Sequence, residues 1–232
     1  ISQIFMKSHR KVELALRSAD LRRLAMNVVY GATRNLYPYL KGAIASLLDH
    51  NKVTKLYVFA EDDTLPFEIP CKHEVINVSG QQYFKPDGPN MNSIFTYMAM
   101  MRVCAPDLIK ANKVIWLDVD TVVCDSLKPL WEIDLKGKWI AWCPERFGTY
   151  KPFGPMYYNS GVCVLNLAQM KKDKVTETAV EMLNRMKLWC TDQDAMNILT
   201  SPDKMVEIDV RYNESFCCGQ TQNPAVVHYA GH

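Results

Sequence analysis

Short apolar segments rich in β-branched and aromatic residues alternate with longer segments of mixed polarity along most of this chain. The apolar segments predict strands, because such residues fit a pleated and buried surface, and the segments between them are long enough for crossover helices. The predicted strands cover residues 26–30, 55–60, 73–78, 113–120, 138–143, 161–167 and 206–210. The predicted helices cover residues 37–49, 92–103 and 171–188, and a further helix begins at Thr191.

This alternation predicts an α/β fold, in which ligands bind beyond the carboxyl ends of the strands. The length of 232 residues suits one large domain, and a chain that is 48% apolar with a net charge of +2 buries enough surface to exclude disorder. The near-neutral charge argues against a nucleic-acid-binding protein and favours a small-molecule ligand. Two loops rich in glycine, proline and aromatic residues, 82–90 and 147–155, are candidate rims of a site.

Residues 1–25 contain a basic amphipathic pattern, which predicts a helical extension that packs on the domain or docks on a partner or a membrane surface. The longest apolar runs have five residues, too few to cross a bilayer, and no secretory signal is recognised. The eight cysteines form no CxxC pair, and most lie in apolar runs. They predict reduced core thiols in a cytoplasmic protein.

The clearest chemical feature is the segment VIWLDVDTVV, in which an apolar strand runs into Asp118 and Asp120. Residues two apart on a strand point the same way, about 6 to 7 Å from each other, so the two carboxylates could share one divalent cation. A solvated turn is the simpler structural interpretation. The same string also fits the first motif of haloacid-dehalogenase-type phosphatases, but the acidic pair that those enzymes need downstream is missing after Asp125.

Four further segments follow the acidic pair in a fixed order: SLKPLWEIDLKGKW, YYNSGVCVLNLAQMK, TDQDAMNIL and VVHYAGH. Together with the acidic pair they resemble glycosyltransferase family 8, which contains bacterial lipopolysaccharide galactosyl- and glucosyltransferases and glycogenins. The resemblance covers about residues 26–232. It implies one GT-A domain over this range, a Rossmann-like nucleotide-diphospho-sugar transferase fold with a mixed central sheet and flanking helices, and a retaining reaction.

The resemblance implies a metal site on the acidic pair. Asp118, Val119 and Asp120 match the family's DxD motif, which contacts the nucleotide-sugar, and His228 matches the histidine that completes the metal site. The implied cofactor is Mn²⁺, with Mg²⁺ as the alternative. Gly231 matches a glycine whose backbone approaches the diphosphate closely.

The resemblance also places the nucleotide. Ala32, Thr33 and Asn35 match the turn that holds the base and ribose of UDP, and Arg102 matches an arginine that reaches the nucleotide and the metal-binding acids. The family often has an acidic residue where Thr33 stands, and a hydroxyl accepts a hydrogen bond more weakly. From the residues alone, Asn35 is a helix N-cap and Arg102 lies on a helix face.

Two segments match positions on the donor sugar: Asn159 with Ser160, and Asp192 with Gln193. The latter pair is the implied catalytic pair, which steadies an oxocarbenium-like sugar. From the residues alone, Asn159 and Ser160 form a turn that leads into a strand. Thr191 and Asp194 form a capping box at a helix start, with Thr191 as the cap residue.

The resemblance therefore implies a metal-dependent retaining transferase that moves galactose or glucose from a UDP-sugar to a glycan, lipid-linked or protein acceptor. A non-catalytic nucleotide-sugar-binding scaffold is the alternative, whereas a sugar-nucleotide pyrophosphorylase would need a Gly-rich start with a basic finger that GATRNLY lacks. In the family a Lys-Pro-Trp segment follows the HYxG motif. That segment and a tail able to dock on the inner face of a membrane would lie beyond His232, and a homo-oligomer is compatible with the sequence.

Overall fold

A seven-stranded mixed sheet forms the centre of the protein, in agreement with the fold class predicted from the sequence. The computed structural model describes residues 26–146, 156–216, 219 and 221–230, so the predicted extension at 1–25 and the predicted loop at 147–155 lie outside the described residues. The strands of this sheet are β1 (Asn27–Gly31), β2 (Lys55–Ala60), β3 (His73–Asn77), β4 (Val114–Leu117), β6 (Ile140–Pro144), β7 (Tyr158–Leu165) and β8 (Met205–Glu207).

One strand of this sheet, β7, runs opposite to the other six. The strand order is β3-β2-β1-β4-β7-β6-β8, and the first four strands are parallel to one another. At the centre, β4 pairs with β7 in antiparallel fashion, with Ile115 opposite Val164, and β7 pairs antiparallel with β6. The carboxyl ends of β1 and β4 therefore meet at one edge beside the amino end of β7, where a ligand site is expected.

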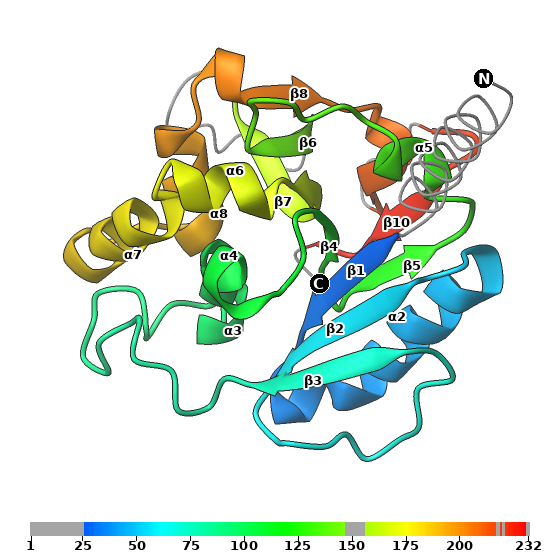
Figure 1. The fold of residues 1–232 in the computed structure, drawn as a ribbon, viewed down its shortest axis with the longest axis horizontal. Helices are drawn as coiled ribbons and strands as arrows, with labels where there is room; N and C mark the ends of the chain where they lie inside the picture. Colours follow the sequence, from blue (N-terminus) through cyan, green and yellow to red (C-terminus); the bar gives the residue numbers. More distant parts are fainter. Residues whose placement is uncertain (1–25, 147–155, 217–218, 220, 231–232) are drawn as a thin grey trace, which may run out of the picture.

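Helices cover both faces of the sheet. In Figure 1, α2 lies on one side of the parallel strands, and α6, α7 and α8 (yellow) gather on the other side of the view. The α-helices are α2 (Tyr37–His50), α3 (Tyr97–Met100), α4 (Ala105–Leu108), α5 (Lys128–Trp131), α6 (Leu167–Lys172), α7 (Val175–Arg185) and α8 (Thr191–Leu199). The 3₁₀ helices are η1 (Arg34–Leu36), η2 (Met101–Cys104), η3 (Pro202–Lys204) and η4 (Val210–Asn213).

The strand residues alternate between two apolar cores, one on each face. Val28 and Tyr30 of β1 lie in the core that includes α2, whereas Val29 lies in the core that includes α3, α6, α7 and α8. The same alternation places Ile115 of β4 in the first core and Trp116 in the second. This period of two, with apolar residues on both faces, is what a sheet covered on both sides requires.

Two predicted helices are wrong in their bounds. The helix predicted at 92–103 starts only at Tyr97, because residues 90–95 form turns in which the Ser93 hydroxyl bonds to the Phe95 carbonyl and competes with helix formation. The helix predicted at 171–188 is two helices, since Lys174 adopts a left-handed conformation with φ of 56° between α6 and α7.

Several strand bounds also differ from the prediction. The predicted strand 113–120 is β4 alone, which ends at Leu117, and residues 118–120 lie outside it. The strand predicted at 161–167 begins earlier, at Tyr158, and the one predicted at 206–210 ends at Glu207. Asn159 and Ser160 therefore belong to β7, and the interpretation of these residues as a turn is wrong.

A second, three-stranded sheet brings the end of the chain back to the centre. It consists of β5 (Thr121–Val123), β10 (Val226–His228) and β9 (Glu214–Ser215). β10 runs antiparallel to β5, with His228 opposite Thr121, and parallel to β9, with His228 opposite Ser215. This pairing carries His228 to the residues that follow β4.

The cysteines agree in part with the predicted core thiols. Cys104, Cys143 and Cys163 are buried, and burial raises the pKa of the Cys163 thiol to about 12. Cys124 is exposed, and Cys71 and Cys190 are half-buried, so not every thiol belongs to the core. Among the described residues, no helix combines the length and the apolar character that crossing a bilayer requires.

Candidate functional site

The acidic pair lies in a tight turn at the centre of the sheet edge. Asp118, Val119 and Asp120 connect β4 to β5, and both the backbone amide and the hydroxyl of Thr121 bond to the Asp118 carbonyl at 3.2 and 2.7 Å. The predicted placement of the two carboxylates on a strand is therefore wrong. The turn brings them closer together than alternation along a strand would.

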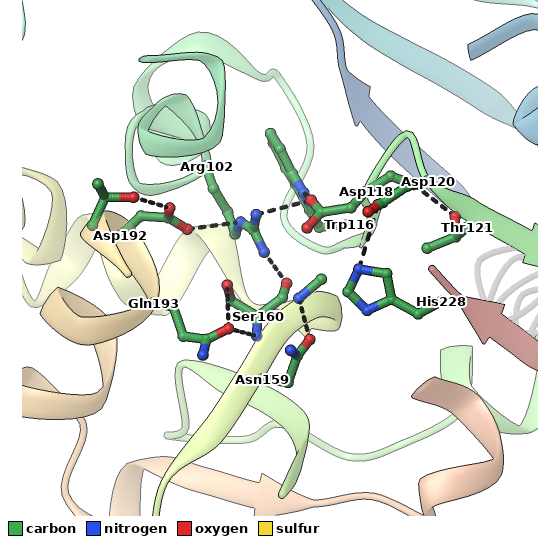
Figure 2. A network of polar contacts seen from close by, with 12 residues as sticks. Arg102, Trp116, Asp118, Asp120, Thr121, Asn159, Ser160, Asp192, Gln193 and His228 are labelled. Atoms are coloured by element: carbon green, nitrogen blue, oxygen red, sulfur yellow. Dashed lines mark hydrogen bonds and ion pairs between the residues drawn. The ribbon is translucent and has the colours of Figure 1, made fainter. Parts of the chain in front are cut away.

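Asp118 is held by the guanidinium of Arg102 and the indole of Trp116. Its Oδ1 accepts hydrogen bonds from Arg102 Nη2 and Trp116 Nε1, each at 2.8 Å (Figure 2). The Arg102 guanidinium also lies over the Trp116 ring, 5.0 Å from its centroid. Among the described residues no donor contacts Asp118 Oδ2, so this oxygen remains available to a ligand.

Arg102 contacts three segments: the acidic turn, β7 and the start of α8. It lies in η2 with 3% of its side chain exposed, donates to Asp118 and to the Ser160 carbonyl, and has its Nε 3.2 Å from Asp192 Oδ2. Burial opposes its charge, but Asp118 and Asp192 outweigh this effect and raise its pKa, so Arg102 stays protonated. Arg102 therefore does lie on a helix, as expected from the residues alone, but its side chain is on the buried face.

Asp192 is the second buried carboxylate of this ion cluster. It is 2% exposed and accepts a hydrogen bond from the Thr191 hydroxyl at 3.1 Å. Burial raises the pKa of Asp192 to about 6, although the charge of Arg102 acts in the opposite direction. The group thus titrates closer to neutrality than an ordinary aspartate.

Asp120 faces His228 across the turn. Asp120 Oδ1 and His228 Nε2 are 3.3 Å apart, and His228 is 4% exposed. Burial raises the pKa of Asp120, but the hydrogen bond and charge of His228 lower this pKa by a larger amount in total, so the net shift is downward. Burial lowers the pKa of His228, yet Asp120 raises it by more, so the net shift is upward.

These residues form a donor set that fits a divalent cation. One ligand atom each of Asp118, Asp120 and His228 lies within 4.8 Å of the others. Two atoms bound at right angles to one ion at about 2.1 Å lie about 3 Å apart, close to the separation of Asp120 Oδ1 and His228 Nε2. Two carboxylates and one imidazole suit a first-row cation or Mg²⁺.

Gly161 allows this close approach. A Cβ atom at position 161 would lie 2.1 Å from His228 Cε1, nearer than any real Cβ contact. Gly161 also bonds through its carbonyl to the Asp118 amide at 2.8 Å. The histidine and the acidic turn therefore meet over a position where only glycine fits.

Gln193 lies beside β7 with both ends of its amide bonded. Its Oε1 accepts from the Ser160 amide at 3.0 Å, with the Ser160 hydroxyl at 3.4 Å. Its Nε2 donates to Glu145 Oε2 at 3.2 Å and to the Tyr157 hydroxyl at 3.1 Å. The side chain that follows Asp192 is thus fixed against the strand that carries Asn159 and Ser160 (Figure 2).

The start of α8 corrects the predicted capping box. Cys190 is the N-cap residue, and Thr191 has a φ of 38° and makes no capping bond. Asp194 instead reaches back, and its Oδ2 accepts from the amides of Trp189 and Cys190 at 2.9 and 3.0 Å. Because Asp194 satisfies these amides, Asp192 and Gln193 are free to face the cluster.

The predicted nucleotide turn follows β1. Ala32 and Thr33 are buried, Asn35 is exposed, and the Thr33 hydroxyl donates to Asn35 Oδ1 at 2.7 Å. Asn35 lies inside η1, and α2 begins only at Tyr37, so its interpretation as an N-cap is wrong. Glu61, from the end of β2, accepts from the Arg34 amide at 2.8 Å and supplies a carboxylate beside this turn.

The structure brings most of the predicted site residues to one edge of the sheet. Arg102 joins Asp118, Ser160 and Asp192, and Asp120 pairs with His228, while Gly231 lies outside the described residues. Five members of the network were not predicted from the sequence: Trp116, Glu145, Tyr157, Gly161 and Asn213. Glu145 lies two residues after the predicted strand 138–143, a position from which it could have been found, but Asn213 carries no such signal.

Comparison with known proteins identifies the family and several relatives of this chain. The model of the family Glycosyl transferase family 8 matches residues 27–232. The chain is 28% identical to General stress protein A of Bacillus subtilis, over 89% of this chain and 85% of that protein. It is 25% identical to the lipopolysaccharide glucosyltransferase WaaO of Escherichia coli, over 91% of this chain and 73% of that protein.

Solved structures agree on the fold. The galactosyltransferase LgtC, solved as an active-site mutant, superposes with a TM-score of 0.68 at 20% identity, covering 89% of this chain and 88% of that one. The glycosyltransferase GlyE of Streptococcus pneumoniae superposes with a TM-score of 0.71 at 21% identity, over 88% of this chain and 54% of that one. These neighbours are GT-A glycosyltransferases, so the predicted fold is confirmed.

Proposed function

The chain belongs to glycosyltransferase family 8, and we propose that it is a metal-dependent retaining enzyme that transfers galactose or glucose from a UDP-sugar to an acceptor. One observation carries this proposal: two carboxylates of the turn after β4 and the imidazole of β10 converge where the carboxyl ends of the central strands meet. Family membership removes the support for a phosphatase of the haloacid-dehalogenase type.

We assign Asp118, Asp120 and His228 as the ligands of the cation. The mixed oxygen and nitrogen set favours Mn²⁺ over Mg²⁺, because imidazole suits first-row metals and Mg²⁺ prefers an all-oxygen shell. Bound there, the cation would neutralise the charge that develops on the departing diphosphate, a contribution of several kcal/mol.

The nucleotide is assigned to the turn after β1. β1 and β4 are parallel neighbours, so Ala32, Thr33 and Asn35 share a sheet edge with the acidic turn. The base and ribose would lie on this turn, Val119 would contact the nucleotide by its position between the two acids, and Gly231 would approach the diphosphate. Glu61 lies beside this turn, and its carboxylate is a stronger acceptor for a base N–H group than the neutral hydroxyl of Thr33.

The donor sugar is assigned to the space between β7 and the start of α8. Asn159 and Ser160 would contact its hydroxyls, and Asp192 and Gln193 would steady positive charge on the sugar ring. A retaining glycosidase needs a carboxylate nucleophile about 5 to 5.5 Å from its acid. Gln193 is an amide whose two ends are already bonded, which favours departure and attack on the same face of the sugar.

Arg102 has a positioning role in this arrangement. Its guanidinium holds Asp118 on one side and Asp192 on the other, and it fixes the Ser160 carbonyl of β7. The groups assigned to the cation and to the sugar are therefore held by one side chain. Arg102 thereby orders the donor side of the site, and holding donor and acceptor in line can contribute about 7 to 11 kcal/mol to catalysis.

The acceptor side remains part of the proposal. We expect a glycan, lipid-linked or protein acceptor, a cytoplasmic location with peripheral contact at the inner face of a membrane, and self-association into a homo-oligomer as a property to be measured. The domain proposed for catalysis comprises residues 26–232, and residues 1–25 are proposed as its extension.

The test is to incubate the protein with Mn²⁺ and a panel of UDP-sugars and to measure release of UDP without an acceptor. We expect release from UDP-galactose or UDP-glucose, its loss in EDTA, and retention of the anomeric configuration in the transferred sugar. Binding of a UDP-sugar without release, in the presence of added acceptors too, would favour the non-catalytic scaffold. Full activity in EDTA would contradict the metal site.

A further inference from the structure

A row of side-chain amides lies behind His228 and away from Asp120. Asn213, at the end of η4, is 6% exposed, and its Oδ1 is 2.8 Å from His228 Nδ1. Its Nδ2 donates to Asn159 Oδ1 at 2.8 Å. The same Asn159 oxygen accepts from the Gly161 amide, also at 2.8 Å. Three segments far apart in the sequence thus meet behind the imidazole.

The direction of every hydrogen bond in this row follows from its first member. A backbone N–H group can only donate, so the Asn159 atom that faces Gly161 is the oxygen. Because that oxygen accepts, Asn213 must present its NH₂ group to it, which leaves the Asn213 oxygen for the imidazole. An oxygen acceptor requires a proton on His228 Nδ1. The neutral ring therefore has its lone pair on Nε2, the nitrogen that faces Asp120.

The opposite end of Asn159 agrees with this direction. Its Nδ2 donates to Glu145 Oε2 at 2.7 Å, and a carboxylate can only accept when it is ionised. The orientation of Asn159 is therefore fixed from two sides, by a backbone donor and by a carboxylate. Neither of these groups can reverse its role, so the row has a single direction.

We propose that Asn213 is a positioning residue that holds neutral His228 in the Nδ1-protonated tautomer, with the Nε2 lone pair directed at the cation site, and that it thereby sets the affinity for the cation. This inference rests on the metal site of the proposed function. A neutral Nε2 and an ionised Asp120 oxygen 3.3 Å apart present two lone pairs to each other, an arrangement that a shared divalent cation makes favourable.

Two variants of Asn213 separate this role from a merely structural one. Asn213→Leu removes the acceptor for His228 Nδ1, whereas Asn213→Asp keeps an acceptor there but loses the donor to Asn159. Both changes disturb a buried hydrogen bond and should lower the stability of the metal-free protein. Only Asn213→Leu removes the partner that selects the tautomer, so only this variant should lose cation affinity.

The matched control is Asn166, at the opposite end of β7. Its Nδ2 donates to the Leu135 carbonyl at 2.8 Å, and its Oδ1 accepts from the Gln169 amide at 3.1 Å. Asn166→Leu therefore also removes two hydrogen bonds of a half-buried asparagine, but it does so far along the strand from Asn159. We expect it to lower stability and to leave cation affinity unchanged.

The experiment measures Mn²⁺ affinity by titration calorimetry and by electron paramagnetic resonance, together with unfolding of the metal-free proteins in denaturant. Asn213→Leu should bind Mn²⁺ about 10- to 100-fold more weakly than the wild type, the usual cost of losing the partner of a ligating histidine. Asn213→Asp and Asn166→Leu should keep most of the affinity. In the diamagnetic Mg²⁺ form of the wild type, ¹⁵N–¹H correlation spectra should show the ring proton of His228 on Nδ1.

Each contrary result has a distinct meaning. Equal Mn²⁺ affinity in Asn213→Leu and the wild type, or equal loss in both Asn213 variants, would overturn the role of Asn213 and leave the metal site standing. A ring proton on Nε2 would overturn both, because a protonated Nε2 has no lone pair for the cation. Absence of Mn²⁺ binding by the wild type would overturn the metal site and this inference together.

Discussion

Asp118 and Asp120 lie two residues apart in one turn, yet the protein holds them by different means. Asp118 lies against a buried ion cluster, in which Arg102 is shared with Asp192. Asp120 faces His228, whose far side meets the neutral amide of Asn213. One side of the site is organised by charge and the other by the direction of hydrogen bonds.

The two arrangements differ in the free energy that their burial requires and in the property of the site that they determine. A buried ion cluster carries a large desolvation penalty, and removing one member leaves another charge without compensation. Neutral amides are cheaper to bury and fix an orientation through their unlike ends. We therefore expect changes on the Arg102 side to act mainly on stability, and changes on the His228 side to act mainly on ligand affinity.

The largest effect should follow a change to the acidic turn itself. Asp120→Asn removes a charged ligand from the His228 side, and turnover should fall about a thousandfold or more, since a bound cation supplies several kcal/mol at the transition state. The fold should survive, because 44% of the Asp120 side chain is exposed. Steady-state rates and circular dichroism spectra check both statements, and a variant with near-normal turnover would exclude Asp120 as a ligand.

The ion cluster should respond chiefly in stability. Arg102→Met removes the positively charged guanidinium that neutralises the carboxylates of Asp118 and Asp192. It should lower the free energy of unfolding by about 3 to 5 kcal/mol. The control is Arg34→Met, which breaks the exposed pair with Asp62 and should change stability little. Denaturant unfolding of both variants makes the comparison, and similar losses in the two would contradict the assigned importance of burial.

Asp192 should give the ion cluster a dependence on pH. Its folded pKa of about 6 exceeds the unfolded value, so the folded state binds the extra proton and is favoured at low pH. The stability that this proton provides is present below pH 4 and is lost as the pH rises through 6. In metal-free protein, the unfolding free energy of the wild type minus that of Asp192→Asn should fall by about 2 kcal/mol between pH 4 and 7.

Denaturant titrations at several pH values measure this difference. A difference that stays constant with pH, or that grows as the pH rises, would mean that Arg102 outweighs burial at Asp192.

A substitution of Gln193 tests whether its amide, which lies between the ion cluster and the His228 side, acts on the donor sugar. Gln193→Ala should lower kcat about a hundredfold with little change in UDP affinity, the pattern of an interaction made only at the transition state. The loss of its hydrogen bonds to Ser160 and Glu145 should also lower stability. Asn197→Ala, one turn later on α8, removes hydrogen bonds to Tyr158 and controls for that loss. An unchanged kcat in Gln193→Ala would return Gln193 to a structural role.

The smallest effect concerns the nucleotide, which would touch both the cation and the turn after β1. With Mn²⁺ present, UDP at ten times its Kd should stabilise the protein by about 1.4 kcal/mol, a rise in melting temperature of about 3 to 6 °C. Without a cation the rise should be absent, because the diphosphate is held mainly through it. Equal shifts with CDP, GDP and UDP would contradict the placement of the base at Thr33 and Asn35.

The sequence predicted the fold class and the strands well because their information is local. Apolar runs such as 55–60 and 140–143 appear as strands, and the motif around Asp118 lies where the carboxyl end of β4 meets the sheet edge. The start of the helix predicted at 92–103 was wrong, because turn bonds of polar side chains compete with the helix in ways that periodicity does not register.

The network behind the site could not be predicted, because its partners are distant in the sequence. Asn159 meets Asn213 over a separation of 54 residues, and Gln193 meets Glu145 over 48. Such pairs depend on how β7, η4 and α8 pack, which no local pattern encodes. The capping box failed for a related reason, since the left-handed φ of Thr191 arises where the chain enters α8 beneath the ion cluster.

Gly161 has a practical consequence for anyone who needs an inert form of this protein. The space for a methyl group at position 161 is already taken by the His228 ring, 2.1 Å from where that methyl would be. Alanine there would displace the imidazole while Asp118, Asp120 and His228 all keep their identity. Gly161→Ala should therefore inactivate the Asp118, Asp120 and His228 site by displacing one side chain, without changing any charge. It can be compared with the variants that do change a charge.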